Sequence, residues 1–292
     1  MLVQLSCSPC RVPFCNFYFD NWAVTEMSAP WKEMAIELTN PDELSNSLVE
    51  RSLDASVKLY YDLHFPDVRP APLLIALHGY GGNKRQMMRE ARQMAPENFA
   101  IATLQGFHQH LKEPREKGEP LRFGFGWLTN FRSEESVGLH HKALLDLTSL
   151  LIKESVADSQ RIFLLGFSQS CALNYRFAFT YPEQLKGVIG ICGGLPGDWD
   201  SSQLYRSSDA GVLHLAGEHD EFYPPSRVAG YDQRLQMRAR NVELYFHEAG
   251  HEIVASMRED IRAWLARLGQ DTGHRQSHPE KPVAGGTSKI WG

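Results

Sequence analysis

The sequence predicts a single domain of the α/β class, in which a mostly parallel sheet is flanked by helices on both faces. Strand patterns and helix patterns alternate along residues 30–268. Most of the strand patterns are short continuous apolar runs, which are typical of strands buried on both faces. No internal repeat or linker divides this stretch. We therefore expect one domain over residues 30–268.

The expected strands differ in pattern along the chain. At residues 57–65 apolar or aromatic residues alternate with other residues, which predicts a strand with one buried face. The remaining strands are predicted from apolar runs at residues 73–77, 99–104, 162–165, 188–192 and 212–216, and from a strand-like run at 242–246.

Helices are expected between these strands. One contains Met87, Ala91 and Met94, and another run of helical pattern ends near Tyr181. Two more keep an apolar face at helical spacing, one at positions 143, 144, 147, 150 and 151 and the last at positions 257, 261, 264 and 268. Ligands of such sheets bind beyond the carboxyl ends of the strands, so we expect the site in the turns that follow the strands.

Composition and charge exclude several classes of protein. The chain has 292 residues, of which 42% are hydrophobic and 22% charged, as in an ordinary folded protein. The net charge is −5 and no dense block of Lys and Arg occurs, so we expect no nucleic-acid partner. No apolar run approaches the ~20 residues of a membrane-spanning helix, so we expect no membrane span. The oligomeric state is not indicated by the sequence.

The two ends are expected to lie outside the fold. We predict an N-terminal extension at residues 1–29, which lacks the pattern of a secretory signal, and therefore a cytoplasmic protein. Residues 269–292 are rich in Gly, Pro and Ser, which predicts a disordered tail. The five cysteines are an odd number and do not show the paired spacing of a four-ligand zinc site, so we expect neither a disulfide framework nor structural zinc.

The strongest motif is the turn after the apolar run at 162–165, which reads Gly-Phe-Ser-Gln-Ser at residues 166–170. A strand, a tight turn and a helix in this order are typical of a nucleophile elbow, which predicts Ser168 as a nucleophile. The flanking positions must be small, and Gly166 and Ser170 both are. The alternative is that Ser168 only caps the following helix.

A nucleophilic serine needs a histidine base and an acid that orients the histidine. In this fold class the acid and then the histidine follow the serine along the chain. Asp220 follows the run at 212–216 and His251 follows the run at 242–246, so these two residues are the predicted partners. Nearby alternatives are Glu218 for the acid and His219 or His247 for the base.

Acyl transfer also needs two N–H donors where negative charge develops on the carbonyl oxygen. The backbone of Gln169 in the elbow is expected to supply one. The glycine-rich turn at residues 77–83, which follows the strand at 73–77, is expected to supply the other from the backbone of Tyr80. A phosphate-binding turn is the alternative, but this turn lacks both the G-x-G-x-x-G spacing and the Lys-Ser/Thr of a P-loop.

Together, Leu-His-Gly-Tyr-Gly-Gly-Asn, Gly-Phe-Ser-Gln-Ser, Gly-Glu-His-Asp and Gly-His at these separations resemble the α/β-hydrolase fold, and within it the phospholipase/carboxylesterase family that includes acyl-protein thioesterases. The resemblance covers roughly residues 55–268. It implies Ser168, Asp220 and His251 as catalytic residues, and Trp127 as an aromatic residue near the substrate. The family usually has Gly-Gly where this chain has Ser170-Cys171.

We therefore predict a serine hydrolase that cleaves carboxylic esters or thioesters of small or acylated substrates through an acyl-enzyme, with no metal and no organic cofactor. We expect residues 105–129 to form an irregular loop at the rim of an open site. One alternative is a zinc hydrolase, because residues 247–251 fit H-E-x-x-H, although Gly250 and the preceding strand pattern disfavour the required helix. Another is a non-catalytic binding module with the same fold.

Overall fold

The computed structural model describes residues 49–112 and 118–270. Residues 49–58 are exposed and form neither helix nor strand. Residues 59–196 and 200–270 belong to one compact unit, whose first strand begins at Tyr61 and whose last helix ends at Gln270. The predicted extension at 1–29 and the predicted start of the domain at residue 30 lie outside the described residues. So does the predicted tail, apart from its first two residues, which are helical.

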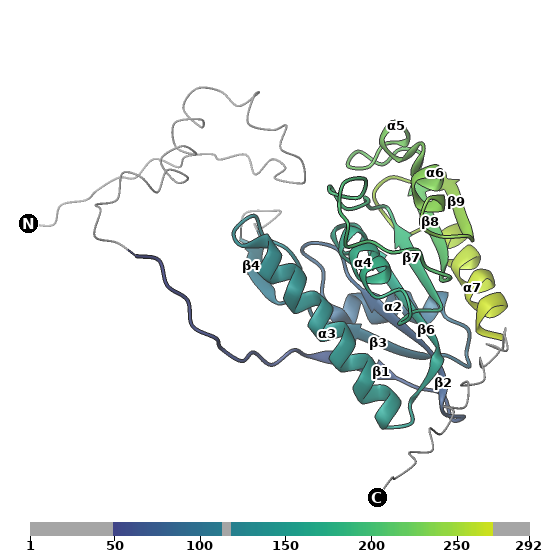
Figure 1. Cartoon of the computed structure of the whole chain (residues 1–292), viewed down its shortest axis with the longest axis horizontal. Helices are drawn as coiled ribbons and strands as arrows, with labels where there is room; N and C mark the ends of the chain where they lie inside the picture. The colour runs from purple at the N-terminus through teal and green to yellow at the C-terminus, as the bar shows by residue number, and fades with distance from the viewer. Residues whose placement is uncertain (1–48, 113–117, 271–292) are drawn as a thin grey trace, which may run out of the picture. The chain divides into compact units, whose positions relative to one another are not determined.

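Seven strands form the main sheet in the order β1-β3-β2-β6-β7-β8-β9 (Figure 1). Their bounds are β1 Tyr61–His64, β2 Ala71–Leu77, β3 Ala100–Leu104, β6 Ala157–Phe167, β7 Gly187–Ile191, β8 Gly211–Gly217 and β9 Val242–His247. Strand β1 runs antiparallel to β3, and all other neighbours are parallel. The predicted α/β class with a mostly parallel sheet is therefore confirmed.

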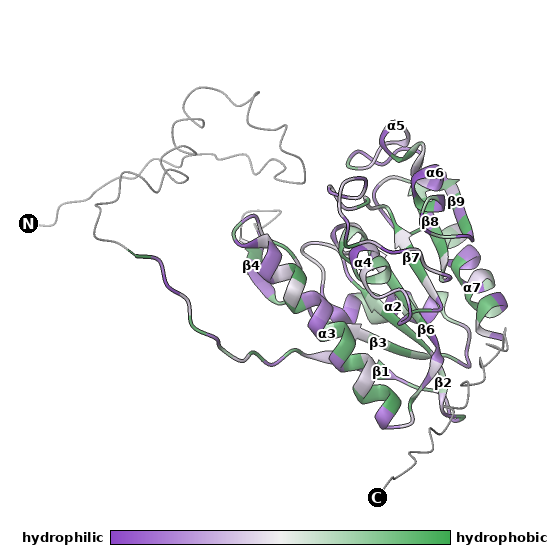
Figure 2. Ribbon diagram, in the orientation of Figure 1, coloured by the Kyte–Doolittle hydropathy of each residue, from purple (hydrophilic) through white to green (hydrophobic). Residues whose placement is uncertain are grey.

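The burial of the strands explains their sequence patterns. Every residue of β2, β3, β7 and β8 is buried, and Figure 2 shows hydrophobic residues along the central strands. Strand β1 lies at the edge and is only half-buried. It is shorter than the predicted strand at 57–65, because Val57 and Phe65 at the two ends of that stretch are exposed.

In the part of the chain that the structure describes, the four longest helices pack against the sheet. Helices α2 (Lys84–Met94) and α7 (Ala255–Gln270) contact each other and the sheet, while α3 (Ser133–Lys153) and α4 (Gln169–Thr180) do the same as a second pair. Met94, Phe163 and Trp264 lie in the core that α2 and α7 share with the sheet. The short helices α5 (Pro225–Val228) and α6 (Tyr231–Gln236) between β8 and β9 were not predicted. In the described part of the chain, no helix is long and apolar enough to cross a membrane.

The expectation of an irregular loop over residues 105–129 is wrong at residues 108–112 and 122–126. Strands β4 (His108–Lys112) and β5 (Arg122–Gly126) form an antiparallel two-stranded sheet. The pair Leu111 and Phe123, which face each other across the two strands, is exposed. Strand β4 has one apolar residue, Leu111, so it lacks the hydrophobic alternation from which a strand is predicted. In β5, Phe123 and Phe125 do alternate with glycine, and this signal was missed in the sequence.

Candidate active site

Ser168 occupies a strained turn between β6 and α4. Its backbone has φ 55° and ψ −115°, a conformation that is uncommon for residues other than glycine. Its N–H donates a hydrogen bond to the carbonyl oxygen of Ile191 at 2.9 Å, which holds the turn against β7. A Cβ atom at Gly166 would lie 2.7 Å from Nδ2 of Asn174 on α4. Strand and helix therefore approach so closely that only glycine fits at residue 166.

The structure brings Ser168, His251 and Asp220 together at the carboxyl end of the sheet. Nε2 of His251 lies 2.9 Å from Oγ of Ser168, and Nδ1 of His251 lies 2.9 Å from Oδ2 of Asp220. Asp220 follows β8, and His251 lies between β9 and α7. Because parallel strands end at the same edge of a sheet, residues far apart in sequence meet here. Asp220 is buried, whereas Ser168 and His251 are half-buried and reachable from solvent.

The surroundings of Asp220 favour its charged form. Its Oδ1 accepts hydrogen bonds from the backbone N–H groups of Phe222 at 2.8 Å and Tyr223 at 2.9 Å. Burial by itself would raise the pKa of Asp220, but the hydrogen bonds from His251 and from these two N–H groups outweigh it and hold the pKa below its ordinary value. A charged Asp220 places the proton of His251 on Nδ1, which leaves Nε2 to accept the proton of Ser168.

The alternative histidines make other contacts. His219 contacts Glu248 at 2.7 Å, and Nδ1 of His247 lies 2.8 Å from Oγ of Ser256. His247 is the last residue of β9, and residues 248–251 that follow it are not helical, so the two histidines of the H-E-x-x-H pattern do not lie one turn apart on a helix. In the described part of the chain, the one group with metal-ligand spacing is Glu218, His219 and Glu248, which is exposed and includes neither His247 nor His251.

The glycine-rich turn lies directly against the elbow. A Cβ atom at Gly79 would be 3.2 Å from Cβ of Ser168. The turn is fixed by β5, because the N–H of Gly81 donates to the carbonyl oxygen of Phe125 at 2.8 Å. On the other side, Gln169 is the first residue of α4, and the first N–H groups of a helix have no partner within it. The segments of Tyr80 and Gln169 therefore border the same serine.

Trp127 is buried beside this site. Its side chain is 1% exposed, and its Nε1–H donates to the carbonyl oxygen of His78 at 2.8 Å. Its backbone N–H donates to Oε1 of Gln169 at 2.9 Å. The predicted contact of Trp127 with substrate is at odds with this burial. The family resemblance implies an aromatic residue near the substrate at position 127 but does not show which way the indole points.

Ser170 has a role that sequence reasoning missed. It is fully buried, and its Oγ accepts a hydrogen bond from the N–H of Phe167 at 3.0 Å and lies 3.1 Å from the carbonyl oxygen of Leu77. Leu77 is the last residue of β2, just before the glycine-rich turn. The hydroxyl therefore connects the elbow to that turn. The departure from the usual glycine of the motif is the one signal in the sequence that marks this position.

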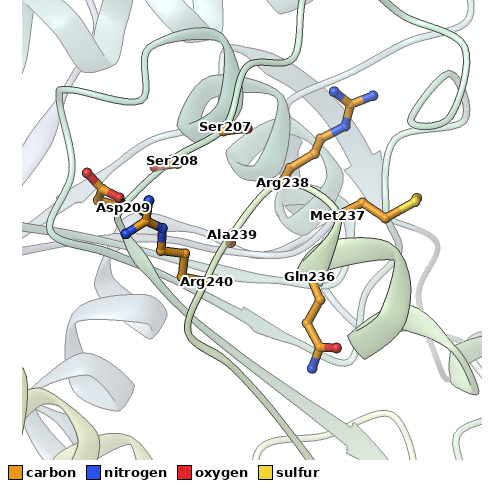
Figure 3. Close-up of a pocket in the computed structure, with 8 residues that line it drawn as sticks. All are labelled: Ser207, Ser208, Asp209, Gln236, Met237, Arg238, Ala239 and Arg240. Carbon is orange, nitrogen blue, oxygen red and sulfur yellow. Dashed lines mark ion pairs between the residues drawn. The ribbon is translucent and has the colours of Figure 1, made fainter.

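A cavity of about 510 Å³ adjoins His251. It is lined by the glycine-rich turn, by Phe167 and Ile253, and by polar side chains of α2 that include Gln86 and Arg89. Figure 3 shows another cavity, of about 650 Å³, lined by residues 207–209 and 236–240. It lies where β8 and β9 begin, at the opposite end of these strands from Asp220 and His251. We therefore take the smaller cavity as the candidate substrate site.

A mostly parallel sheet that carries a serine on a strained strand-to-helix turn, with a histidine and an aspartate in the loops after later strands, defines the α/β-hydrolase class. The crystal structure of a carboxylesterase from Bacillus cereus has the same fold, with a TM-score of 0.57 and 19% identity over 72% of this chain and 94% of that one. The structure of acyl-protein thioesterase 2 from Zea mays gives a TM-score of 0.52 and 16% identity over 72% and 98%.

Within that class, the model of the phospholipase/carboxylesterase family matches residues 62–268, and the chain belongs to this family. The predicted resemblance is thus confirmed. Acyl-protein thioesterase 1 from Eremothecium gossypii is 28% identical over 149 residues, which are 48% of this chain and 63% of that protein. The putative esterase NocK from Nocardia uniformis subsp. tsuyamanensis is 24% identical over 56% of this chain and 46% of its own. The chain thus spans less than two thirds of the length of these relatives.

Proposed function

We propose that this protein is a serine hydrolase that cleaves carboxylic esters or thioesters through an acyl-enzyme intermediate. The observation that carries the proposal is the pair of 2.9 Å contacts that join Ser168, His251 and Asp220 in one row. Family membership supports the ester or thioester as the substrate class. A binding module that had kept only the fold would have no need of a strained serine aligned with a base.

In the proposed mechanism, Oγ of Ser168 attacks the carbonyl carbon while Nε2 of His251 takes the hydroxyl proton. His251 then returns that proton to the leaving alcohol or thiol, and the acyl group stays on Ser168. Water then attacks the acyl carbon while Nε2 of His251 takes its proton. His251 returns this proton to Oγ of Ser168 as the bond between Oγ and the acyl carbon breaks and the acid leaves. Asp220 orients the imidazole and stabilises its charged form. The backbone N–H groups of Gln169 and Tyr80 stabilise the negative charge on the carbonyl oxygen.

The walls of the site favour substrates with polar groups or acyl chains of short to medium length. Gln86, Arg89 and Glu90 of α2 line one side of the cavity beside His251. Long acyl chains prefer continuous apolar walls, which these three side chains do not supply. We therefore propose an open site without interfacial activation. A sharp rise in rate when a short-chain triglyceride exceeds its solubility would contradict this part of the proposal.

The central test is Ser168→Ala. We expect this variant to lose both fluorophosphonate labelling and turnover of p-nitrophenyl esters, because residual catalysis without the nucleophile is weaker by several orders of magnitude. Ser136→Ala is the matched control, since Ser136 is a buried serine on α3 that contacts His108 instead of the site. Labelling that persisted in folded Ser168→Ala would refute the assignment.

A further inference from the structure

Trp127 lies between the two segments that carry the proposed N–H donors. Its indole N–H reaches the carbonyl oxygen of His78, two residues before Tyr80, and its backbone N–H reaches the side chain of Gln169. One residue therefore contacts both the glycine-rich turn and the elbow. The indole is buried and does not line the cavity beside His251.

The two residues that Trp127 contacts are themselves held in place by further hydrogen bonds. Nε2 of the Gln169 side chain donates to the carbonyl oxygen of Leu128 at 3.1 Å, so both polar atoms of this amide are used. Nε2 of His78 accepts the N–H of Gly106 at 3.0 Å, which places the ring proton on Nδ1, 2.7 Å from the carbonyl oxygen of Gly79. Burial lowers the pKa of His78 to about 4, so the ring is neutral at pH 7.

A glycine-rich turn needs such an anchor more than other turns do. Glycine restricts the backbone least, and Gly81 has φ +73°, so the sequence of the turn does not by itself fix the direction of its N–H groups. Stabilisation of an oxyanion depends on donors held 2.7–3.1 Å from one point in space. A rigid buried side chain that connects the two donor segments would keep their separation constant.

We propose that Trp127 is a positioning residue, which fixes the separation between the backbone N–H groups of Tyr80 and Gln169 and does not bind substrate. This inference rests on the proposed function. The simpler interpretation is core packing alone, since the indole also packs edge-on against Phe107 and His140. The two interpretations differ in what the loss of a single N–H group does to the rate.

The test is Trp127→Phe, which keeps an aromatic ring and removes the bond to His78. The matched control is Trp264→Phe, because Trp264 is 3% exposed and its Nε1–H donates to Oε1 of Glu243 at 3.0 Å, far along α7 from the site. We expect Trp127→Phe to lower kcat about ten- to a hundredfold with KM nearly unchanged. We expect Trp264→Phe to keep kcat. Thermal unfolding is measured for both, and rates are compared well below the unfolding temperatures.

Affinity for a boronic acid, which forms a tetrahedral adduct with the serine, gives a second measurement. Its affinity should fall in Trp127→Phe by about the same factor as kcat/KM. If Trp127→Phe does not fold, Gln169→Met breaks the same connection at its other end and should give the same loss of kcat.

Three results would overturn the inference. A rise in KM at constant kcat would show that the indole binds substrate. An unchanged kcat in folded Trp127→Phe would show that Trp127 contributes only to packing of the core. Equal losses of kcat in the Trp127 and Trp264 variants would show a general effect of stability. None of these affects the proposed function, which depends on the separate behaviour of Ser168→Ala.

Discussion

Replacing Gly217 by alanine tests how strongly kcat depends on the position of His251. Gly217 is the last residue of β8, and a Cβ atom there would lie 2.5 Å from the carbonyl oxygens of both Ala249 and Gly250. Both oxygens belong to the backbone just before His251, so neither can turn away as the end of a flexible side chain would. The loop must shift by roughly half an ångström before these contacts reach 3.0 Å.

A shift of that size acts directly on the contact between His251 and Ser168. Misplacement of a catalytic group by ~1 Å can lower a rate ~100-fold, so we expect kcat of Gly217→Ala to fall about ten- to a hundredfold. The assay is turnover of p-nitrophenyl butyrate, together with the rate of fluorophosphonate labelling, at a temperature where circular dichroism shows the variant to be folded.

Gly138→Ala is the control for this experiment. Gly138 lies on α3, and a Cβ atom there meets no atom within 4 Å. Alanine in a helix is favoured over glycine by ~1 kcal/mol, so this variant should be slightly more stable and equally active. If folded Gly217→Ala kept the wild-type kcat, the reasoning that the loop sets the geometry of His251 would be refuted.

Four further outcomes are expected. Burial lowers the pKa of His140 to about 3 and of His214 to about 4. Below pH 6.5 the unfolded chain therefore binds more protons than the folded chain, and stability that is complete above pH 6.5 should fall by roughly 3 kcal/mol per histidine by pH 4. Equal urea midpoints at pH 7 and pH 4 would contradict this expectation. Burial raises the pKa of the Cys192 thiol to about 12, so mass spectrometry should find alkylation by iodoacetamide only after denaturation. Ser170→Ala removes a buried hydroxyl and should lower the free energy of unfolding by about 1–3 kcal/mol in urea titration. Glu248→Gln and a strong chelator should each leave esterase activity within about twofold, whereas a loss that zinc restores would favour the metal mechanism.

The strands that the sequence predicts most directly are those whose residues are buried on both faces. Strands β2 and β8 were recognisable because each is a largely apolar run in the interior of the sheet, interrupted in β8 by the buried His214. Strand β4 was not, because the hairpin packs through backbone contacts to the glycine-rich turn and β4 carries exposed residues such as Leu111. Hydrophobic periodicity indicates which side chains are buried, but it does not indicate hydrogen bonds between backbone groups.

The candidate site, too, could be predicted only in part from the sequence. Ser168, Asp220 and His251 could be proposed from motif order, because the fold brings the ends of successive strands to one edge. The orientation of the Trp127 indole and the partners of the Ser170 hydroxyl depend on rotamers and on backbone atoms from distant segments. Neither is encoded in the spacing of residues along the chain.

The position of each strand in the sheet has a consequence for how activity is lost. Strand β6, which presents Ser168, is paired on both sides, whereas β9, which precedes His251, is an edge strand with one neighbour. Edge elements open more readily than central ones, with a smaller free energy than global unfolding. We therefore expect mild heat or denaturant to displace His251 while Ser168 keeps its place in the sheet. Activity would then be lost at a lower denaturant concentration than the one that unfolds the sheet.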